Sequence, residues 1–315
     1  MKKIILALTA LVLSVSMLSA QDLQSATDTY NNGAAALSSG DKAAALTNFQ
    51  SALKMAEALG ADGADLLANC KAAIPAVILS IGKELYNNKN FDDALAKIQE
   101  AAKVAQEYGI EDVAKEATEL VPQIALTKDM DAANDAFAAK DMAAAAEGYK
   151  KVLAADSTNA AASLRLVQCL ANVDDLEGAK KILPLAKNNG QGENAAKVIG
   201  TTYLKKAAAA LKANKLADAV EFAEQVNEFT ENPQAFLVAG QASQKLNKGA
   251  QAIKNFEKYL EAAPTASNAN AIAFTVAALY QQAGNKAKAK EFYQKVVSDP
   301  KFGASAKQQI DALSK

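Results

Sequence analysis

One short pattern recurs seven times along this chain of 315 residues and constrains its fold more than any other feature. Each copy consists of a turn, an Ala, an aromatic or aliphatic residue about four positions on, and then a small or apolar pair. The seven alanines are spaced 49, 51, 34, 40, 33 and 37 residues apart: Ala45, Ala94, Ala145, Ala179, Ala219, Ala252 and Ala289. Self-similarity at such periods indicates stacked structural repeats.

An amphipathic segment precedes each turn and carries a small residue or valine at a matching place: Gly33, Gly82, Ala133, Val167, Ala207, Gly240 and Ala277. A small residue that faces an Ala on the next helix lets the two backbones approach closely, because the side chains at the contact set the distance between helices. Alanine dominates the apolar half of the composition, and Pro occurs only 6 times. Alanine is the best helix former, so we expect a stack of helical hairpins.

The repeat resembles the tetratricopeptide repeat family, whose unit of about 34 residues is a helix, a turn and a helix. The clearest copy runs from Phe236 through Gly240 to Ala252, Phe256 and Tyr259, and the resemblance covers residues 26 to about 300. It implies an all-α fold, a right-handed α-solenoid of about seven hairpins. The early Trp of the family is absent from every copy.

The first two spacings exceed the family unit by 15 and 17 residues, which predicts longer helices in the first two hairpins. Gly60 and Gly109 are placed as helix C-caps. The helices that follow should be kinked or broken near Pro75 and Pro122, because proline removes a helical hydrogen bond. A capping helix is expected over residues 304–313.

Residues 1–20 have the pattern of a secretory signal peptide, with two lysines, an apolar run over residues 4–15 and the small residues Ser19 and Ala20 before the expected cut. The alternative is a membrane anchor, for which the run is short of the roughly 20 residues needed. No Cys near the cut offers a site for a lipid. We therefore expect an exported protein, periplasmic or extracellular, without stable membrane insertion.

The charge changes sign along the chain. Residues 21–190 contain 24 acidic and 16 basic residues, a net of −8, whereas residues 191–315 contain 11 and 16, a net of +5. We assign four acidic hairpins to 21–190, and three basic hairpins with the capping helix to 191–315. The polar segment 188–194 between them is either a hinge or a plain turn between repeats. Nucleic-acid binding is not expected, because it needs a clustered basic strip.

The residues do not support a catalytic, cofactor or metal site. The chain has no His, the usual base of a nucleophilic triad and the commonest metal ligand. Cys70 and Cys169 lie 99 residues apart, in hairpins that should not touch, and are predicted to be unpaired. Adjacent acidic residues such as Asp92 and Asp93 fall at helix starts, where the helix dipole favours them. We expect a protein that is not an enzyme.

The resemblance also implies a concave groove, lined by the first helices of the hairpins, that takes peptides. Carried over position by position, its partner-binding residues are Tyr30, Lys83, Tyr86, Asn134, Phe137, Arg165, Gln168, Lys205, Gln241 and Phe274. Tyr86 and Phe137 are either binding anchors or fillers between hairpins. Arg165, the single Arg, either holds a carboxylate or is a solvated helix residue. By contrast, five aromatic residues are expected to be core: Phe49, Tyr149, Phe256, Tyr280 and Tyr293.

These observations favour a scaffold that binds a protein or peptide partner in the groove. A structural protein that acts by self-association and a small-ligand binder remain as alternatives, and an enzyme is the least favoured class. The sequence leaves the partner and the oligomeric state open.

Overall fold

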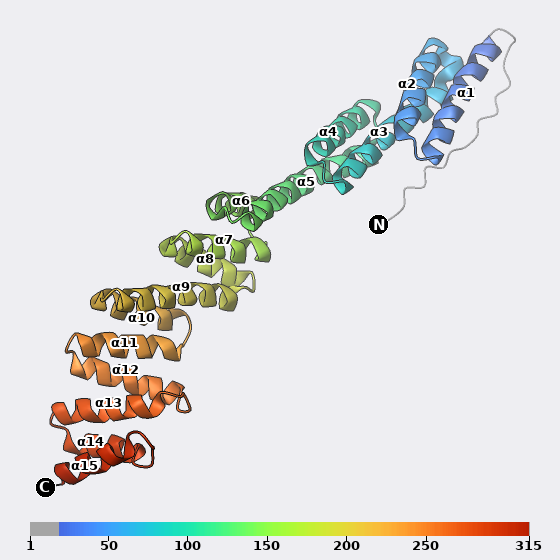
Figure 1. Ribbon diagram of the computed structural model, residues 1–315. Coiled ribbons are helices and arrows are strands. Elements are labelled where there is room, and N and C mark those ends of the chain that lie inside the picture. Colours follow the sequence, from blue (N-terminus) through green and yellow to red (C-terminus); the bar gives the residue numbers. More distant parts are fainter. Residues whose placement is uncertain (1–18, 315) are drawn as a thin grey trace. The chain divides into compact units, whose positions relative to one another are not determined.

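The computed structural model describes residues 19–314, and within them every regular element is helical. The all-α fold expected from the sequence is therefore confirmed. The helices form seven consecutive hairpins (Figure 1): α1 (Ser19–Ser38) with α2 (Lys42–Ala58), α3 (Ala64–Asn87) with α4 (Phe91–Tyr108), α5 (Glu111–Ala138) with α6 (Met142–Ala155), α7 (Ala160–Asn172) with α8 (Leu176–Asn188), α9 (Gly192–Lys212) with α10 (Leu216–Phe229), α11 (Pro233–Lys245) with α12 (Gly249–Ala262), and α13 (Ala269–Gln282) with α14 (Lys286–Lys295). A short 3-10 helix, Gly60–Gly63, precedes α3, and α15 (Gly303–Leu313) is the capping helix.

The chain divides into two compact units, Met1–Ala132 and Ala133–Lys315, and the division falls inside α5. In the second unit each helix from α6 to α15 packs on the next one, and α9 also packs on both α7 and α11. The first helices of successive hairpins are thus neighbours there. The polar segment 188–194 contains only the turn between α8 and α9, and its role as a hinge stays a prediction.

The long helices lie in the second and third hairpins, where α3 has 24 residues and α5 has 28, and not in the first two hairpins as expected. The residues after Gly60 and Gly109 belong to the first helix of the next hairpin. α3 continues through Pro75 and α5 through Pro122, so neither proline ends its helix. In the described part of the chain, residues 60–87 alone are long and apolar enough to span a membrane by length and composition. Cys70, Ile74 and Ile78 of this segment are buried in the core of the first unit, so its apolar character serves packing.

The seams between the helices of a hairpin differ in one respect from the expectation. A methyl group added at Gly240 would lie 2.5 Å from Cδ1 of Phe256, and one at Gly82 would lie 2.5 Å from Cγ1 of Ile98. At Gly33 it would lie 2.9 Å from Cδ1 of Phe49. The small residue of the first helix therefore faces the bulky residue four positions after the recurrent Ala, rather than the Ala itself.

The turns inside the hairpins share a left-handed residue just after the first helix. Glycine occupies this place at Gly40 and Gly284, but five turns use other residues with φ between 57° and 64°: Lys89, Lys140, Asp174, Asn214 and Asn247. A side chain is disfavoured in this backbone region because its Cβ approaches the following carbonyl oxygen. Strain is thus stored at five turns of the array.

Both cysteines are free and buried, Cys70 on α3 in the first unit and Cys169 on α7 in the second. Burial raises the pKa of the Cys70 thiol to about 12 and that of the Cys169 thiol to about 11. The thiolate is the reactive form, so the folded protein should hardly react with a disulfide reagent at pH 8. We expect two thiols to be titrated in denaturant and almost none without it. Rapid labelling of either cysteine in the folded protein would show that its side chain is accessible and would contradict its burial.

Candidate functional site

The second unit contains a hollow of about 800 Å³ between α7 and α9, bounded also by α5. All three are first helices of successive hairpins. We call it the α7–α9 groove, and its lining residues are Phe137, Leu164, Gln168, Ala171, Asn172, Asn194, Lys197, Val198, Thr201, Thr202 and Lys205.

The groove runs along the helices. Its residues on α9, from Asn194 to Lys205, recur at every turn of that helix, and those on α7, from Leu164 to Asn172, do the same. The stripe on α9 covers eleven steps, which correspond to about 16 Å at 1.5 Å per residue. A hollow of this length accepts a chain segment better than a compact small molecule.

The aromatic wall of the groove is held by the hairpin beneath it. The ring centroids of Phe137 and Tyr149 lie 6.4 Å apart in an edge-to-face arrangement. Tyr149 is fully buried, its hydroxyl donates a 2.8 Å hydrogen bond to Oδ1 of Asn134, and burial raises its pKa. Phe137 itself is half-buried, so one part of the ring packs in the hairpin and the rest faces the groove.

Arg165 packs against the ring of Phe137. Its guanidinium carbon lies 4.3 Å from the centroid of Phe137, within the range of a cation–π contact. Its Nη1 donates to Oε1 of Gln168 at 3.1 Å. Arg165, Phe137 and Gln168 therefore form one connected group on α5 and α7.

Positive charge lies along the groove without a carboxylate to balance it. Lys197 and Lys205 are exposed, and the lining contains no acidic residue. Within residues 19–314, neither ammonium group forms an ion pair. The neighbouring Lys206 behaves differently, because its Nζ lies 2.6 Å from Oδ1 of Asp174.

The structure brings together five of the residues predicted to bind a partner: Asn134, Phe137, Arg165, Gln168 and Lys205. It adds others that the sequence did not single out, above all Lys197, Val198 and Thr201. Counting back from Lys205 along the same helix in steps of three or four would have found them.

The other predicted residues lie elsewhere. Lys83 pairs with Glu116 at 2.5 Å. Tyr86, also in the first unit, packs against Phe91 with ring centroids 5.9 Å apart. Neither residue lines the α7–α9 groove.

Tyr30 and Phe274 contact the second helix of their own hairpins. Tyr30 is buried, and its ring centroid lies 5.0 Å from that of Phe49. Phe274 is half-buried, and its ring centroid lies 5.2 Å from that of Tyr293. These two side chains are packing residues that offer little surface to a partner. Gln241, half-buried on α11, does not line the α7–α9 groove.

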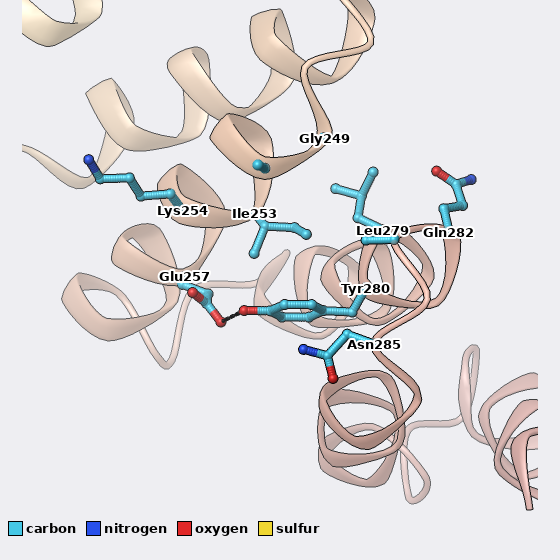
Figure 2. A pocket seen from close by; sticks show the side chains of 10 residues that line it. Gly249, Ile253, Lys254, Glu257, Leu279, Tyr280, Gln282 and Asn285 are labelled. Carbon is cyan, nitrogen blue, oxygen red and sulfur yellow. Dashed lines mark hydrogen bonds between the residues drawn. The ribbon is translucent and has the colours of Figure 1, made fainter.

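A second hollow, of about 600 Å³, lies between the beginning of α12 and the end of α13. Figure 2 shows Ile253 and Leu279 above the ring of Tyr280, whose hydroxyl donates a 2.8 Å hydrogen bond to Oε1 of Glu257. Burial and this hydrogen bond raise the pKa of Tyr280 to about 12. Five aromatic residues are predicted to be core, and the prediction is confirmed for Phe49, Tyr149, Phe256 and Tyr293. The fifth, Tyr280, is half-buried: its ring centroid lies 5.8 Å from that of Phe292 in the core, and it also faces the hollow.

These features define a class: an array of helical hairpins whose first helices line a groove. The family model described as tetratricopeptide repeat matches residues 136–199, which include Phe137, the groove residues on α7 and three of the six on α9. Over these residues the chain has the tetratricopeptide repeat of this family.

Solved structures with similar folds include a MamA protein, 19% identical over 57% of this chain and 94% of that one, with a TM-score of 0.32. A tetratricopeptide repeat protein from Parabacteroides merdae is 10% identical over 93% of this chain and 100% of that one, with a TM-score of 0.26. PilW, a type IV pilus biogenesis factor, is 12% identical over 77% and 99%, with a TM-score of 0.27. Similarities this low say nothing about function. No curated protein matches the chain.

Proposed function

We propose that this protein is a non-catalytic scaffold that holds a peptide segment of a partner protein in the α7–α9 groove. The observation that carries the proposal is the groove itself, about 800 Å³ in volume and lined by three successive first helices. Tetratricopeptide repeats are in general protein-interaction scaffolds. Half-buried aromatic and apolar side chains beside exposed amides and lysines are a suitable lining, since apolar contacts supply affinity and polar groups fix orientation.

Export to the periplasm or beyond is part of the same proposal. It is supported by the signal-peptide pattern of residues 1–20, of which residues 1–18 lie outside the described part of the chain. Mass spectrometry of the protein recovered from cell fractions would test it. Cleavage near Ala20 and recovery outside the cytoplasm are expected, and a full-length cytoplasmic protein would contradict export.

Filling the groove should abolish binding. Thr201 is exposed on α9 and lines the groove, so a Trp there would occupy its middle. On an array of random twelve-residue peptides, we expect the parent protein to capture a reproducible subset and Thr201→Trp to lose at least about tenfold in signal for that subset, the scale of a removed anchor contact.

Ala208→Trp is the matched control, because Ala208 is exposed on the same helix but does not line the groove. It should keep the captured subset, and both variants should melt as the parent does. Capture that survives Thr201→Trp unchanged, or no selective capture by the parent, would refute the proposed function.

A second candidate is self-association, favoured by the charges of the two units. Residues 21–132 contain 17 acidic and 9 basic residues, a net of −8, whereas residues 133–315 contain 18 and 23, a net of +5. Opposite net charges on two units promote association between copies at low salt. Light scattering at 20 and 500 mM NaCl tests this candidate: a monomer under both conditions excludes it.

A further inference from the structure

The charge of the α7–α9 groove selects the chemistry of its occupant. Ten lysines form ion pairs in the described part of the chain, yet Lys197 and Lys205 are not among them. Arg165 adds a third cation where the groove meets Phe137. The lining of the groove therefore holds two cations and no carboxylate, with the guanidinium of Arg165 beside it on Phe137.

The polar groups of the groove also favour an acceptor-rich occupant. The Oε1 atom of Gln168 already accepts from Arg165, which leaves the two hydrogens of its Nε2 as donors. Thr201 is exposed on the facing helix. Donors and cations together match carboxylate and carbonyl oxygens.

The spacing of the two lysines gives a register. Lys197 and Lys205 are eight residues apart on α9, which is about 12 Å along the helix axis. An extended chain rises about 3.3 Å per residue and points alternate side chains to opposite sides. Four residues of such a chain therefore cover about the same length, and side chains at positions i and i+4 point the same way.

The side chains between the two carboxylates of the segment also have neighbours in the groove. If positions i and i+4 face α9, positions i+1 and i+3 face α7 and α5, where Leu164 and Phe137 line the groove. Apolar side chains at i+1 and i+3 would be buried against them.

An extended segment fits the volume better than a helix does. A helix is about 10 Å wide with its side chains, so a length of 16 Å occupies about 1,300 Å³. The groove holds about 800 Å³ and would leave a large part of such a helix outside.

We propose that the occupant is an extended, acidic segment of a partner protein, with carboxylates four residues apart over Lys197 and Lys205 and apolar side chains against Phe137 and Leu164. This inference rests on the proposed function and adds the class of peptide. Binding of such a segment should weaken as salt is added, because Lys197 and Lys205 are exposed and salt screens their attraction for the carboxylates.

The test uses the full chain and three fluorescein-labelled peptides in an anisotropy titration at 50 mM NaCl. The first peptide is Gly-Glu-Val-Thr-Val-Glu-Gly, the second has Gln in place of both Glu, and the third has both Glu adjacent to each other. We expect the first to bind about tenfold more tightly than the second and more tightly than the third. Two exposed ion pairs account for a difference of this size. The advantage should largely disappear at 500 mM NaCl.

The double variant Lys197→Gln, Lys205→Gln should bind the first two peptides equally. The matched control Lys212→Gln, Lys215→Gln removes two exposed lysines that do not line the groove, one at the end of α9 and one directly before α10, and it should keep the preference. Far-UV circular dichroism should be the same for both variants.

The outcomes separate the two proposals. Binding of both peptides with equal affinity, abolished by Thr201→Trp, would overturn the acidic segment and leave the groove as a binding site. The acidic segment would also be overturned if the array peptides captured through the groove had no excess of acidic residues. Failure of the first peptide to bind would overturn the acidic segment as well. Competition by a ten-nucleotide single-stranded DNA as effective as the peptide would also overturn it. If no binding depends on Thr201, the proposed function fails as well.

Discussion

Phe256→Ala is expected to destabilise the second unit by about 3–5 kcal/mol, the cost of truncating a buried aromatic side chain. Phe256 is 1% exposed and belongs to the core cluster that joins α11, α12, α13 and α14. Urea denaturation followed by far-UV circular dichroism measures the loss. Folding in a repeat array depends on contacts between neighbouring hairpins, so the truncation should weaken the docking of the hairpins on either side.

Phe222→Ala is the matched control. Phe222 lies on α10 and is half-buried, and its ring centroid is 6.3 Å from that of Tyr203. Its truncation should cost clearly less than that of Phe256. Equal losses for the two variants would mean that the hairpin seam around Phe256 does not carry the stability assigned to it.

Gly240→Ala should also destabilise the protein, by about 1–3 kcal/mol, the usual cost of an overpacked seam. The new methyl group would lie 2.5 and 2.6 Å from two ring carbons of Phe256, closer than packed atoms come. In an open helix the same change would stabilise by up to about 1 kcal/mol, because Ala is the better helix former. Gly→Ala usually stabilises a helix, but in this seam the same substitution should destabilise the protein.

Gly249→Ala supplies the comparison, since nothing lies within 4 Å of a methyl group at that position. It should leave the protein unchanged or slightly more stable. Combining Gly240→Ala with Phe256→Leu should recover part of the loss, with a coupling free energy of about 0.5–3 kcal/mol. Additive effects of these two changes would show that Gly240 and Phe256 do not meet.

The sequence predicted the hairpins and their seams because the same packing problem recurs in every repeat. A position that must be small to admit Phe256 or Phe49 recurs with the repeat period, so the pattern is visible in the chain itself. The sequence did not show which residue faces the small position, because the Ala and the bulky residue four places later both recur.

The groove was only half predicted, because its residues differ from hairpin to hairpin. Asn134 and Gln168 directly follow the small position, and both belong to the groove or its wall. Tyr30 and Phe274 lie three residues before it, and both contact the aromatic residue of the second helix instead. Leu164 lies three residues before Val167 and lines the groove, so one repeat position packs in some hairpins and faces the groove in another.

Lys197 was missed because α9 is longer than a family helix. It has 21 residues, whereas α7 has 13, and when Ala207 is aligned with Val167 the segment 192–199 has no counterpart in α7. Residues of an extra segment have no place in a repeat alignment, and only their helical spacing from Lys205 connects them to the groove.

The five strained turns imply that this protein is less stable than its fold allows. Each left-handed residue other than glycine costs on the order of 1–3 kcal/mol, less for Asn and Asp than for Lys89 and Lys140. The five turns belong to different hairpins, and distant changes add up nearly independently. Replacement by glycine would therefore give a graded series of arrays with identical seams and grooves. In such a series the ease with which single hairpins open would vary while the binding surface stayed constant, so the contribution of local opening to partner exchange would become measurable.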